Sequence, residues 1–152
     1  MKLSTRSRYG TRLLLDLAEH GSEKFVQLKD VSKRQGISLK YLEQIVIPLK
    51  KANYLVSARG AGGGYRLARS PGQITVGEIV ALLEGGNSIT HCATKPEVCD
   101  RTQSCLTRTL WIETAEVIFE KLNSVTLSDL IRNKDKPREK VAGPLKGYVR
   151  ER

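Results

Sequence analysis

The sequence is poor in aromatic residues, in histidine and in long apolar runs. Aromatic residues make up 5% of its 152 residues and apolar residues 39%, and two histidines are present. This modest apolar content indicates a small core that depends in part on a partner subunit. No apolar stretch approaches the roughly 20 residues needed to cross a bilayer, and Met1–Arg6 lacks the apolar run of a signal peptide. We therefore expect a cytoplasmic protein that does not bind a membrane.

Cysteine is scarce too, and its count of three is odd. In the cytosol, where thiols stay reduced, such a set favours metal or redox chemistry over a disulfide framework. The two histidines, His20 and His91, lie far apart in the sequence. Apart from His91, which adjoins Cys92, the cysteines have no histidine–acid set nearby of the kind that nucleophilic catalysis uses. The sequence therefore argues against an enzyme.

Positive charge is present in excess and is unevenly distributed. The net charge is +10. Residues 1–70 carry fourteen Lys and Arg against five Asp and Glu, residues 71–133 carry five against eight, and the remaining tail carries seven against three. A basic lobe beside an acidic one is typical of a nucleic-acid-binding domain with a separate second module. Charge alone leaves a solvated basic surface as the alternative.

The first third of the chain predicts three helices joined by short turns. Apolar residues at helical spacing place these helices at residues 7–20, 29–35 and 38–51. Gly36 supplies the turn before the third helix, and Ser38 is a suitable N-cap for it. Pro48 lies inside the third helix, where its missing amide predicts a kink or break near Ile47.

A glycine-rich β-hairpin follows these helices. The expected strands, residues 54–59 and 65–68, flank a run of glycines. Beyond them, Thr75 and Glu78 form a capping-box pattern that opens a further helix, which ends near Leu83. Helix, turn, helix and basic hairpin follow one another in the order of a winged helix-turn-helix. The expected fold class is therefore mainly α with a small β-hairpin wing and a long C-terminal helix.

The third helix is the expected DNA-recognition element, because an α-helix fits the major groove of B-DNA. Its polar face offers the candidate DNA-contacting residues Ser38, Lys40, Tyr41, Glu43 and Gln44. Lysine and tyrosine can hold phosphates, and glutamine can hydrogen-bond adenine. Phosphates repel a carboxylate unless it accepts a hydrogen bond from a base, typically cytosine N4. Glu43 is therefore the expected base-specific residue, with simple exposure to solvent as the alternative.

The segment from Arg59 to Arg66 is the expected wing. Its glycines let the backbone come close to DNA, and Arg59 can enter a narrow minor groove of strong negative potential. A nucleotide-binding phosphate loop is the rival interpretation. It fails because no Gly-Lys-Ser/Thr follows the glycines and a strand, not a helix, comes next.

The three cysteines fall within a single expected loop. Cys92, Cys99 and Cys105 are separated by gaps of six and five residues. Thiolates are soft ligands that suit an iron–sulfur cluster, zinc or copper(I), but structural zinc sites usually show shorter gaps. Three thiolates leave a fourth position for another ligand, which tends to raise the reduction potential of a cluster. Three ligand-free thiols are the alternative.

A long helix is expected from Leu106 to about Leu122. An apolar row at coiled-coil spacing follows it, formed by Trp111, Ala115, Ile118, Leu122 and Val125. We interpret this row as a homodimer interface, with packing against the N-terminal lobe as the alternative. The expected segments are a DNA-binding domain at 1–84, a cysteine loop at 85–105, a dimerisation helix at 106–133 and a basic disordered tail at 134–152.

The sequence closely resembles the IscR family of bacterial iron–sulfur-responsive regulators. The superfamily also includes the nitric-oxide sensor NsrR and the cysteine-metabolism regulator CymR. The matching stretches are Lys2–Thr5 with Arg8-Tyr9, Gln35–Gln44, Leu55–Ser57 with Arg59-Gly60, Gly62–Tyr65, Val76–Glu78, the three cysteines, and Cys105–Thr107 with Leu110-Trp111. The similarity covers about residues 1–133 and is specific.

This resemblance implies a dimer whose winged helices bind a palindromic promoter site in double-stranded DNA. It also implies that Glu43 tunes the class of site bound, that Arg59 contacts the minor groove, and that Cys92, Cys99 and Cys105 are cluster ligands. The cluster is [2Fe–2S] in IscR-type proteins and can be [4Fe–4S] in NsrR-type relatives. The implied role is a repressor, or a dual regulator, of iron–sulfur cluster assembly genes, with RNA polymerase or cluster-assembly proteins as further candidate partners.

The sequence departs from the family at the fourth ligand. The family places a histidine three residues after the last cysteine, and Arg108 stands there. A guanidinium has no lone pair to offer, so Arg108 cannot be a ligand. Some relatives use an N-terminal carboxylate where this chain has Arg8. The first cysteine gap is also one residue longer than in the IscR pattern. The remaining candidates are an exogenous thiol, water, or a side chain among His20, His91, Glu97 and Asp100.

Two other functions are compatible with these patterns. One is a nitric-oxide or redox-sensing regulator of the same superfamily. The other, from a different class, is a carrier that delivers iron–sulfur or zinc and whose basic lobe binds an acidic protein. Specific binding to a duplex, weakening steeply with salt, separates DNA recognition from a carrier role.

Overall fold

The computed structural model describes residues 2–21 and 23–134. Its helices are α1 (Thr5–His20), α2 (Leu28–Gln35), α3 (Leu39–Lys51), α4 (Val76–Glu84), α5 (His91–Thr94), α6 (Arg108–Asn123) and α7 (Leu127–Arg132). Its strands are β1 (Leu55–Ala58) and β2 (Gly64–Leu67), and short 3-10 turns are η1 (Pro71–Gln73) and η2 (Pro96–Val98). The tail predicted from residue 134 onward lies, apart from Lys134, outside the described residues.

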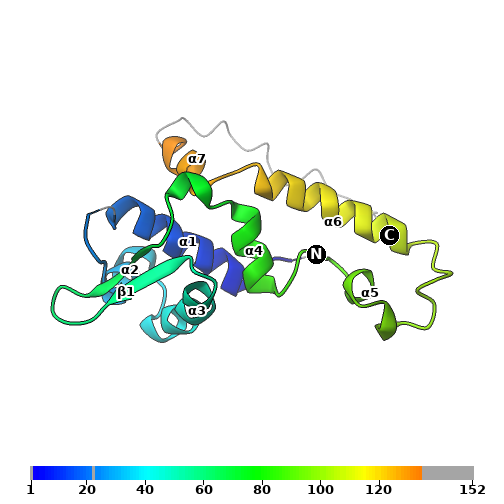
Figure 1. The fold of residues 1–152 in the computed structure, drawn as a ribbon, viewed down its shortest axis with the longest axis horizontal. Coiled ribbons are helices and arrows are strands. Elements are labelled where there is room, and N and C mark those ends of the chain that lie inside the picture. The colour runs from blue at the N-terminus through cyan, green and yellow to red at the C-terminus, as the bar shows by residue number, and fades with distance from the viewer. Residues whose placement is uncertain (1, 22, 135–152) are drawn as a thin grey trace, which may run out of the picture.

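The molecule is elongated, with a winged lobe at one end and the cysteine segment at the other (Figure 1). The first three helices and the hairpin form the lobe, α4 lies in the middle, and α6 extends from there toward α5. The core of the lobe is made of apolar side chains from α1 to α4 and α7, among them Leu13, Leu14, Leu17, Val31, Leu42, Ile45, Leu49, Ile79 and Leu127. No helix in the described part of the chain is long and apolar enough to span a bilayer.

The predicted helix boundaries are set by caps. The hydroxyl of Ser38 accepts a hydrogen bond from the Tyr41 amide at 3.3 Å and so begins α3. Thr75 and Glu78 form the predicted capping box of α4, with the Thr75 amide 2.9 Å from the Glu78 carboxylate. The first helix begins earlier than predicted, because Ser4 rather than Ser7 is its N-cap.

The prediction near Ile47 was a kink or break, and a break does not occur, because α3 continues through Pro48 to Lys51. A proline inside a helix leaves the carbonyl four residues before it without its usual donor. That carbonyl belongs to Gln44, which lies on the exposed side of α3, where water can bind it. The helix therefore stays continuous despite the missing hydrogen bond.

The segment 106–133, expected as one dimerisation helix, contains two helices. After α6 the chain returns to the lobe: Thr126 pairs with Thr75 in an isolated antiparallel bridge, and the Leu127 amide donates to the Ile74 carbonyl at 3.0 Å. Leu127 is fully buried in the core of the lobe. Val125, the last residue of the expected seam, lies outside α6, and Ala115 is buried within the chain. Part of the seam thus packs inside the protomer, which is the alternative that the sequence left open.

A buried carboxylate joins the first two helices. Asp16 of α1 is 1% exposed. It accepts hydrogen bonds from the guanidinium of Arg34 at 2.6 and 3.0 Å and from the side-chain amide of Gln35 at 2.9 Å. Arg12 donates to the backbone and side-chain oxygens of Gln35. Burial raises the pKa of Asp16, but the hydrogen bonds from Arg34 and Gln35 outweigh this effect and bring the pKa below its ordinary value.

Asp16→Asn is expected to lower the free energy of unfolding at neutral pH by about 2 kcal/mol. The variant loses charge-assisted hydrogen bonds, while Arg34, whose side chain is 34% exposed, can still turn toward water. Urea unfolding monitored by circular dichroism measures the difference. Glu23→Gln, which removes an exposed carboxylate from the loop after α1, is the control and should change stability by less than about 0.5 kcal/mol.

The difference in stability between wild type and Asp16→Asn should depend on pH. The folded pKa of Asp16 lies below the ordinary value of 3.8, so acid protonates the unfolded chain first. The stability that Asp16 contributes is full above the ordinary pKa and is lost as the pH falls through the folded pKa. The difference between wild type and Asp16→Asn should therefore shrink in acid, and a difference that grew would contradict this account of Asp16.

Candidate DNA interface and cysteine segment

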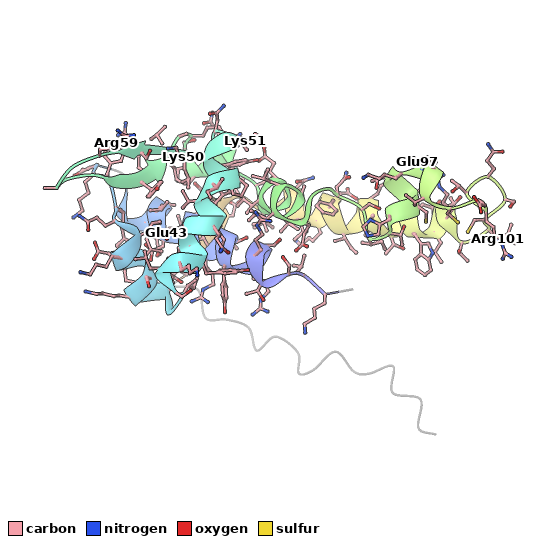
Figure 2. All side chains as sticks on the ribbon, turned by 90° about the horizontal axis from the view of Figure 1, so that it is seen from below. Glu43, Lys50, Lys51, Arg59, Glu97 and Arg101 are labelled. Carbon is pink, nitrogen blue, oxygen red and sulfur yellow. The ribbon has the colours of Figure 1, made fainter. Side chains whose placement is uncertain are left out.

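The outward side of α3 is polar and mostly basic. Its exposed residues beyond the first turn are Glu43, Gln44, Ile47, Lys50 and Lys51, and Lys40 precedes them. Figure 2 shows Glu43 partway along α3 and Lys50 and Lys51 at its C-terminal end, on the lobe that also carries Arg59. Within the described residues Glu43 has no ion-pair partner, although three lysines share its side of the helix. The surface is thus a basic face that carries one unpaired carboxylate.

Two of the predicted contact residues also have structural roles. Ser38 is the N-cap of α3, so its hydroxyl is already engaged with the Tyr41 amide. The ring of Tyr41 is half-buried and packs edge-to-face on Tyr9 of α1, with 5.8 Å between ring centroids. Lys40 and Gln44 are exposed and free of such packing. DNA contacts by all four residues stay predictions, and Lys40 and Gln44 are the most accessible of them.

The wing stands beside the C-terminal end of α3. The ammonium of Lys50 donates to the hydroxyl of Ser57 on β1 at 2.9 Å. Strand β1 ends at Ala58, so Arg59 is the first residue of the exposed loop. The side-chain amide of Gln27 donates to the Ala61 carbonyl at 3.3 Å and connects the loop with the start of α2. Arg59 is therefore held on the same side of the lobe as the basic end of α3.

The sequence suggested that the glycines of the wing let its backbone come close to DNA. In the structure, two of these glycines are needed for contacts within the lobe itself. Gly64 has φ +143°, and a Cβ there would lie 2.3 Å from the Val26 carbonyl oxygen, because Val26 pairs with Tyr65. A Cβ at Gly63 would lie 2.4 Å from the Ala58 carbonyl oxygen. These two glycines are required by packing within the lobe. Gly62, in contrast, has open space around it at the tip.

Lys50 and Lys51 are DNA-interface candidates that the sequence analysis missed. The signal was the pair of consecutive lysines in the last turn of the recognition helix, directly before the hairpin. Their relevance depends on the continuity of α3 through Pro48, because a break there would have turned both side chains away from Glu43.

The cysteine segment is more ordered than the predicted loop. Cys92 lies in the short helix α5, Cys99 follows η2, and Cys105 lies three residues before α6 begins. All three thiols are free and half-buried. The hydroxyl of Thr107 lies 3.4 Å from the Cys105 sulfur, and its hydrogen bond is the main reason why the pKa of Cys105 lies below its ordinary value.

The three thiols of this segment are suitable ligands for a soft metal centre, but the structure does not bring them close together. Three thiols within one segment are the ligands that iron–sulfur clusters prefer. In the described residues, however, no group of three or more cysteine, histidine or acidic side chains is close enough to hold a metal ion. The segment therefore supplies the ligand types, and its cysteines have to approach one another to bind a cluster.

Arg108, which stands where the IscR-type pattern has a histidine, forms hydrogen bonds to the backbone of the cysteine segment. From the first turn of α6 its guanidinium donates to the backbone carbonyls of Cys92 at 3.2 Å and Ala93 at 3.4 Å. The side chain thus ties α5 to α6 across the cysteine segment. It contacts the backbone next to a thiol and offers no lone pair, in agreement with its exclusion as a ligand.

Comparison with known proteins places this architecture in a family. The Rrf2 family, described as an iron-dependent transcriptional regulator, matches residues 3–133. The protein rrf2 of Nitratidesulfovibrio vulgaris is 51% identical over 133 residues, which is 88% of this chain and 89% of the relative. The HTH-type transcriptional regulator IscR of Pectobacterium carotovorum is 41% identical over 135 residues, which is 89% of this chain and 82% of the relative.

Two solved structures share the fold. CymR of B. subtilis, a global cysteine regulator, has a TM-score of 0.74 and 37% identity, covering 89% of this chain and 99% of that one. IscR of T. potens has a TM-score of 0.73 and 36% identity, covering 97% and 95%. The predicted winged-helix fold class and the resemblance to IscR-type regulators are confirmed. The chain belongs to the Rrf2 family of DNA-binding transcription regulators and is not an enzyme.

Proposed function

We propose that this protein is a homodimeric, cytoplasmic regulator that binds palindromic promoter sites under the control of an iron–sulfur cluster. Each α3 enters the major groove, where Glu43 contacts a base, and each Arg59 enters the neighbouring minor groove. The protein acts as a repressor or dual regulator of iron–sulfur cluster assembly genes. The iron-dependent description of the family and the IscR relatives support this assignment of the signal.

The observation that carries the proposal is the unpaired carboxylate of Glu43 on the basic side of α3. Phosphates attract Lys40, Lys50 and Lys51 but repel Glu43, so electrostatics alone would not place a carboxylate there. An amino group of cytosine in the major groove offers a hydrogen bond that compensates the repulsion. Glu43 therefore gives up general affinity in return for base specificity, which is a property of a sequence-specific protein.

Apolar side chains along α6 support the homodimer. Leu106, just before the helix, is 97% exposed, and Val117 within it is 65% exposed. Leu110 and Trp111 are also exposed, so α6 carries exposed apolar side chains among its charged ones. A soluble regulator gains free energy by covering such a surface with its second copy. Two winged lobes joined in this way match the two halves of a palindromic site.

The cysteine segment is the proposed sensor. Cys92, Cys99 and Cys105 would be the protein ligands, and the most suitable cluster is [2Fe–2S], with [4Fe–4S] as the alternative. When bound, the cluster supplies redox sensitivity to the segment. The chain itself contributes three half-buried thiols, the favoured ionisation of Cys105 and the attachment by Arg108. A fourth ligand has to come from another side chain or from outside the protein.

Physical contacts connect the cysteine segment with the DNA-binding lobe. Arg108 attaches α5 to α6. At the other end of α6, Asn123 lies so close to α4 that a Cβ at Gly77 would be 1.9 Å from its side-chain oxygen. The carboxylate of Glu84, at the end of α4, accepts a hydrogen bond from Ser7 of α1 at 2.6 Å. A change in the segment can therefore reach the lobe through α6 and α4.

Glu43→Ala is expected to relax the sequence preference of the protein. Selection from a random duplex library gives the preferred site, and the affinities of wild type and variant for single-base variants of that site measure the preference. At the cytosine facing Glu43, discrimination should fall by about ten-fold, because one base contact is worth about 1–3 kcal/mol. Lys40→Ala is the control: it should weaken all duplexes alike and reduce the salt slope by about one. An unchanged preference in Glu43→Ala would show that Glu43 faces solvent.

Anaerobic purification tests the sensor. Wild type should contain about two irons and two acid-labile sulfides per chain, with visible charge-transfer bands, and Cys92→Ala should lose them. Ser104→Ala, which changes an exposed residue of the same segment without removing a thiol, should keep them. Four of each per wild-type chain would indicate an NsrR-like sensor. A wild type that holds no iron or sulfide even after reconstitution would exclude the cluster and leave zinc, thiol redox chemistry or a partner as the signal.

Arg108→Ala is expected to loosen α5 without unfolding the lobe. Losing the two guanidinium hydrogen bonds should speed amide hydrogen exchange in residues 91–95 by about five-fold, because about 1 kcal/mol of local stability is removed. Mass spectrometry of peptides from this segment and from α1 makes the comparison within one sample. Arg101→Ala removes the same charge from an exposed loop position. If hydrogen exchange in residues 91–95 accelerated equally in both variants, the loss of charge rather than the loss of the contact with α5 would be its cause.

A further inference from the structure

The recognition surface contains an apolar side chain that the core does not explain. Ile47 is 67% exposed, although isoleucine is among the residues most often buried. It follows Glu43 by four residues and Gln44 by three, so the three side chains share one side of α3. The inward side of the helix is formed by Leu42, Ile45, Val46 and Leu49, all of them buried. Ile47 therefore lies on the side of α3 that carries the proposed base contact.

The surroundings of Ile47 favour nucleic acid over an apolar protein surface. It borders a hollow of about 380 Å³, which is lined also by Arg6, Tyr41, Gln44, Ile45 and Pro48. Lys40, Lys50 and Lys51 are exposed on the same helix, and the proposed function assigns these lysines to phosphates. An exposed apolar side chain on a helix that also exposes three lysines is complementary to the thymine methyl group, the apolar group that lies in the major groove between the phosphate backbones.

We propose that Ile47 contacts the C5-methyl group of a thymine and is a specificity-determining residue beside Glu43. This inference rests on the proposed function, because it requires α3 to enter the major groove. Thymine alone among the four standard bases presents a methyl group there, and apolar side chains recognise it by contact. Burial of one methyl group should strengthen binding about four-fold. The hydrophobic contact thus adds thymine selection to the hydrogen bond expected of Glu43.

Replacement of thymine by deoxyuridine tests this contact, because it removes the methyl group and keeps base pairing. Full-length protein is used to select a site from a random duplex library, and each thymine of the selected site is replaced in turn. At one symmetric pair of positions, replacement in both half-sites should weaken binding to wild type about fifteen-fold. Ile47→Ala should bind the original site about as weakly and show no further loss on replacement.

Two controls separate this effect from changes in folding. Alanine has a higher helix propensity than isoleucine, so Ile47→Ala should keep its thermal unfolding midpoint, as measured by circular dichroism. Val98→Ala removes a similarly exposed apolar side chain, 54% exposed, from the cysteine segment far from α3. This control should retain the full sensitivity to deoxyuridine.

The outcomes distinguish the inference from the proposed function. A wild type that selects no sequence at all contradicts both. A selected site that lacks thymine, or that tolerates deoxyuridine at every position, refutes the role of Ile47 and leaves sequence-specific binding intact. Sensitivity to deoxyuridine that persists in Ile47→Ala also overturns the inference, since another residue then contacts the methyl group. An affinity loss in Ile47→Ala without any deoxyuridine effect would assign the side chain to a protein or sugar contact and reject the thymine.

Discussion

The proposed DNA-binding surface depends on the ion pair between buried Asp16 and Arg34. A carboxylate with 1% exposure is costly to keep charged unless its oxygens are occupied by donors, and Arg34 and Gln35 occupy them. Both donors belong to the last turn of α2, so the interaction sets where α2 ends against α1. Gly36, in the left-handed conformation with φ +63°, then turns the chain directly into α3. The orientation of the proposed recognition helix thus follows from this charged contact and Gly36, together with the packing of its buried side in the core.

Close contacts also fix the connection between this lobe and α6, the helix that leads to the cysteine segment. Gly77 permits α4 and the end of α6 to touch, and Leu127 places the chain after α6 in the core of the lobe. Because both ends of this connection are packed, α6 cannot pivot freely where it meets the lobe. The cysteine segment, in contrast, is joined mainly by short helices and by Arg108. Stability therefore decreases along the molecule from the lobe to the cysteines.

The winged lobe could be predicted from the sequence because its signals are local. Ser38, the Thr75–Glu78 capping box and the alternation of helices with a glycine hairpin each determine their structure within a few residues. The predictions that failed depend on the environment that the fold creates around a residue. Pro48 is tolerated because α3 has a solvent-facing side there, and Ala115 and Leu127 are buried by segments far along the chain. The candidate site followed the same division: Lys40, Glu43 and Gln44 are exposed, as expected for the polar face of a helix, whereas the exposure of Ile47 and the contact of Lys50 with the wing emerge only from the fold.

The replacement of the family histidine by Arg108 illustrates how one position can exchange a metal ligand for a structural contact. A histidine there would offer a nitrogen to the cluster and would leave the α5 carbonyls to other donors. Arginine extends further, satisfies two of those carbonyls and keeps its positive charge close to Cys92. The consequence is a segment whose shape is held by the protein's own hydrogen bonds, and a cluster bound there, as proposed, would take its fourth ligand from elsewhere.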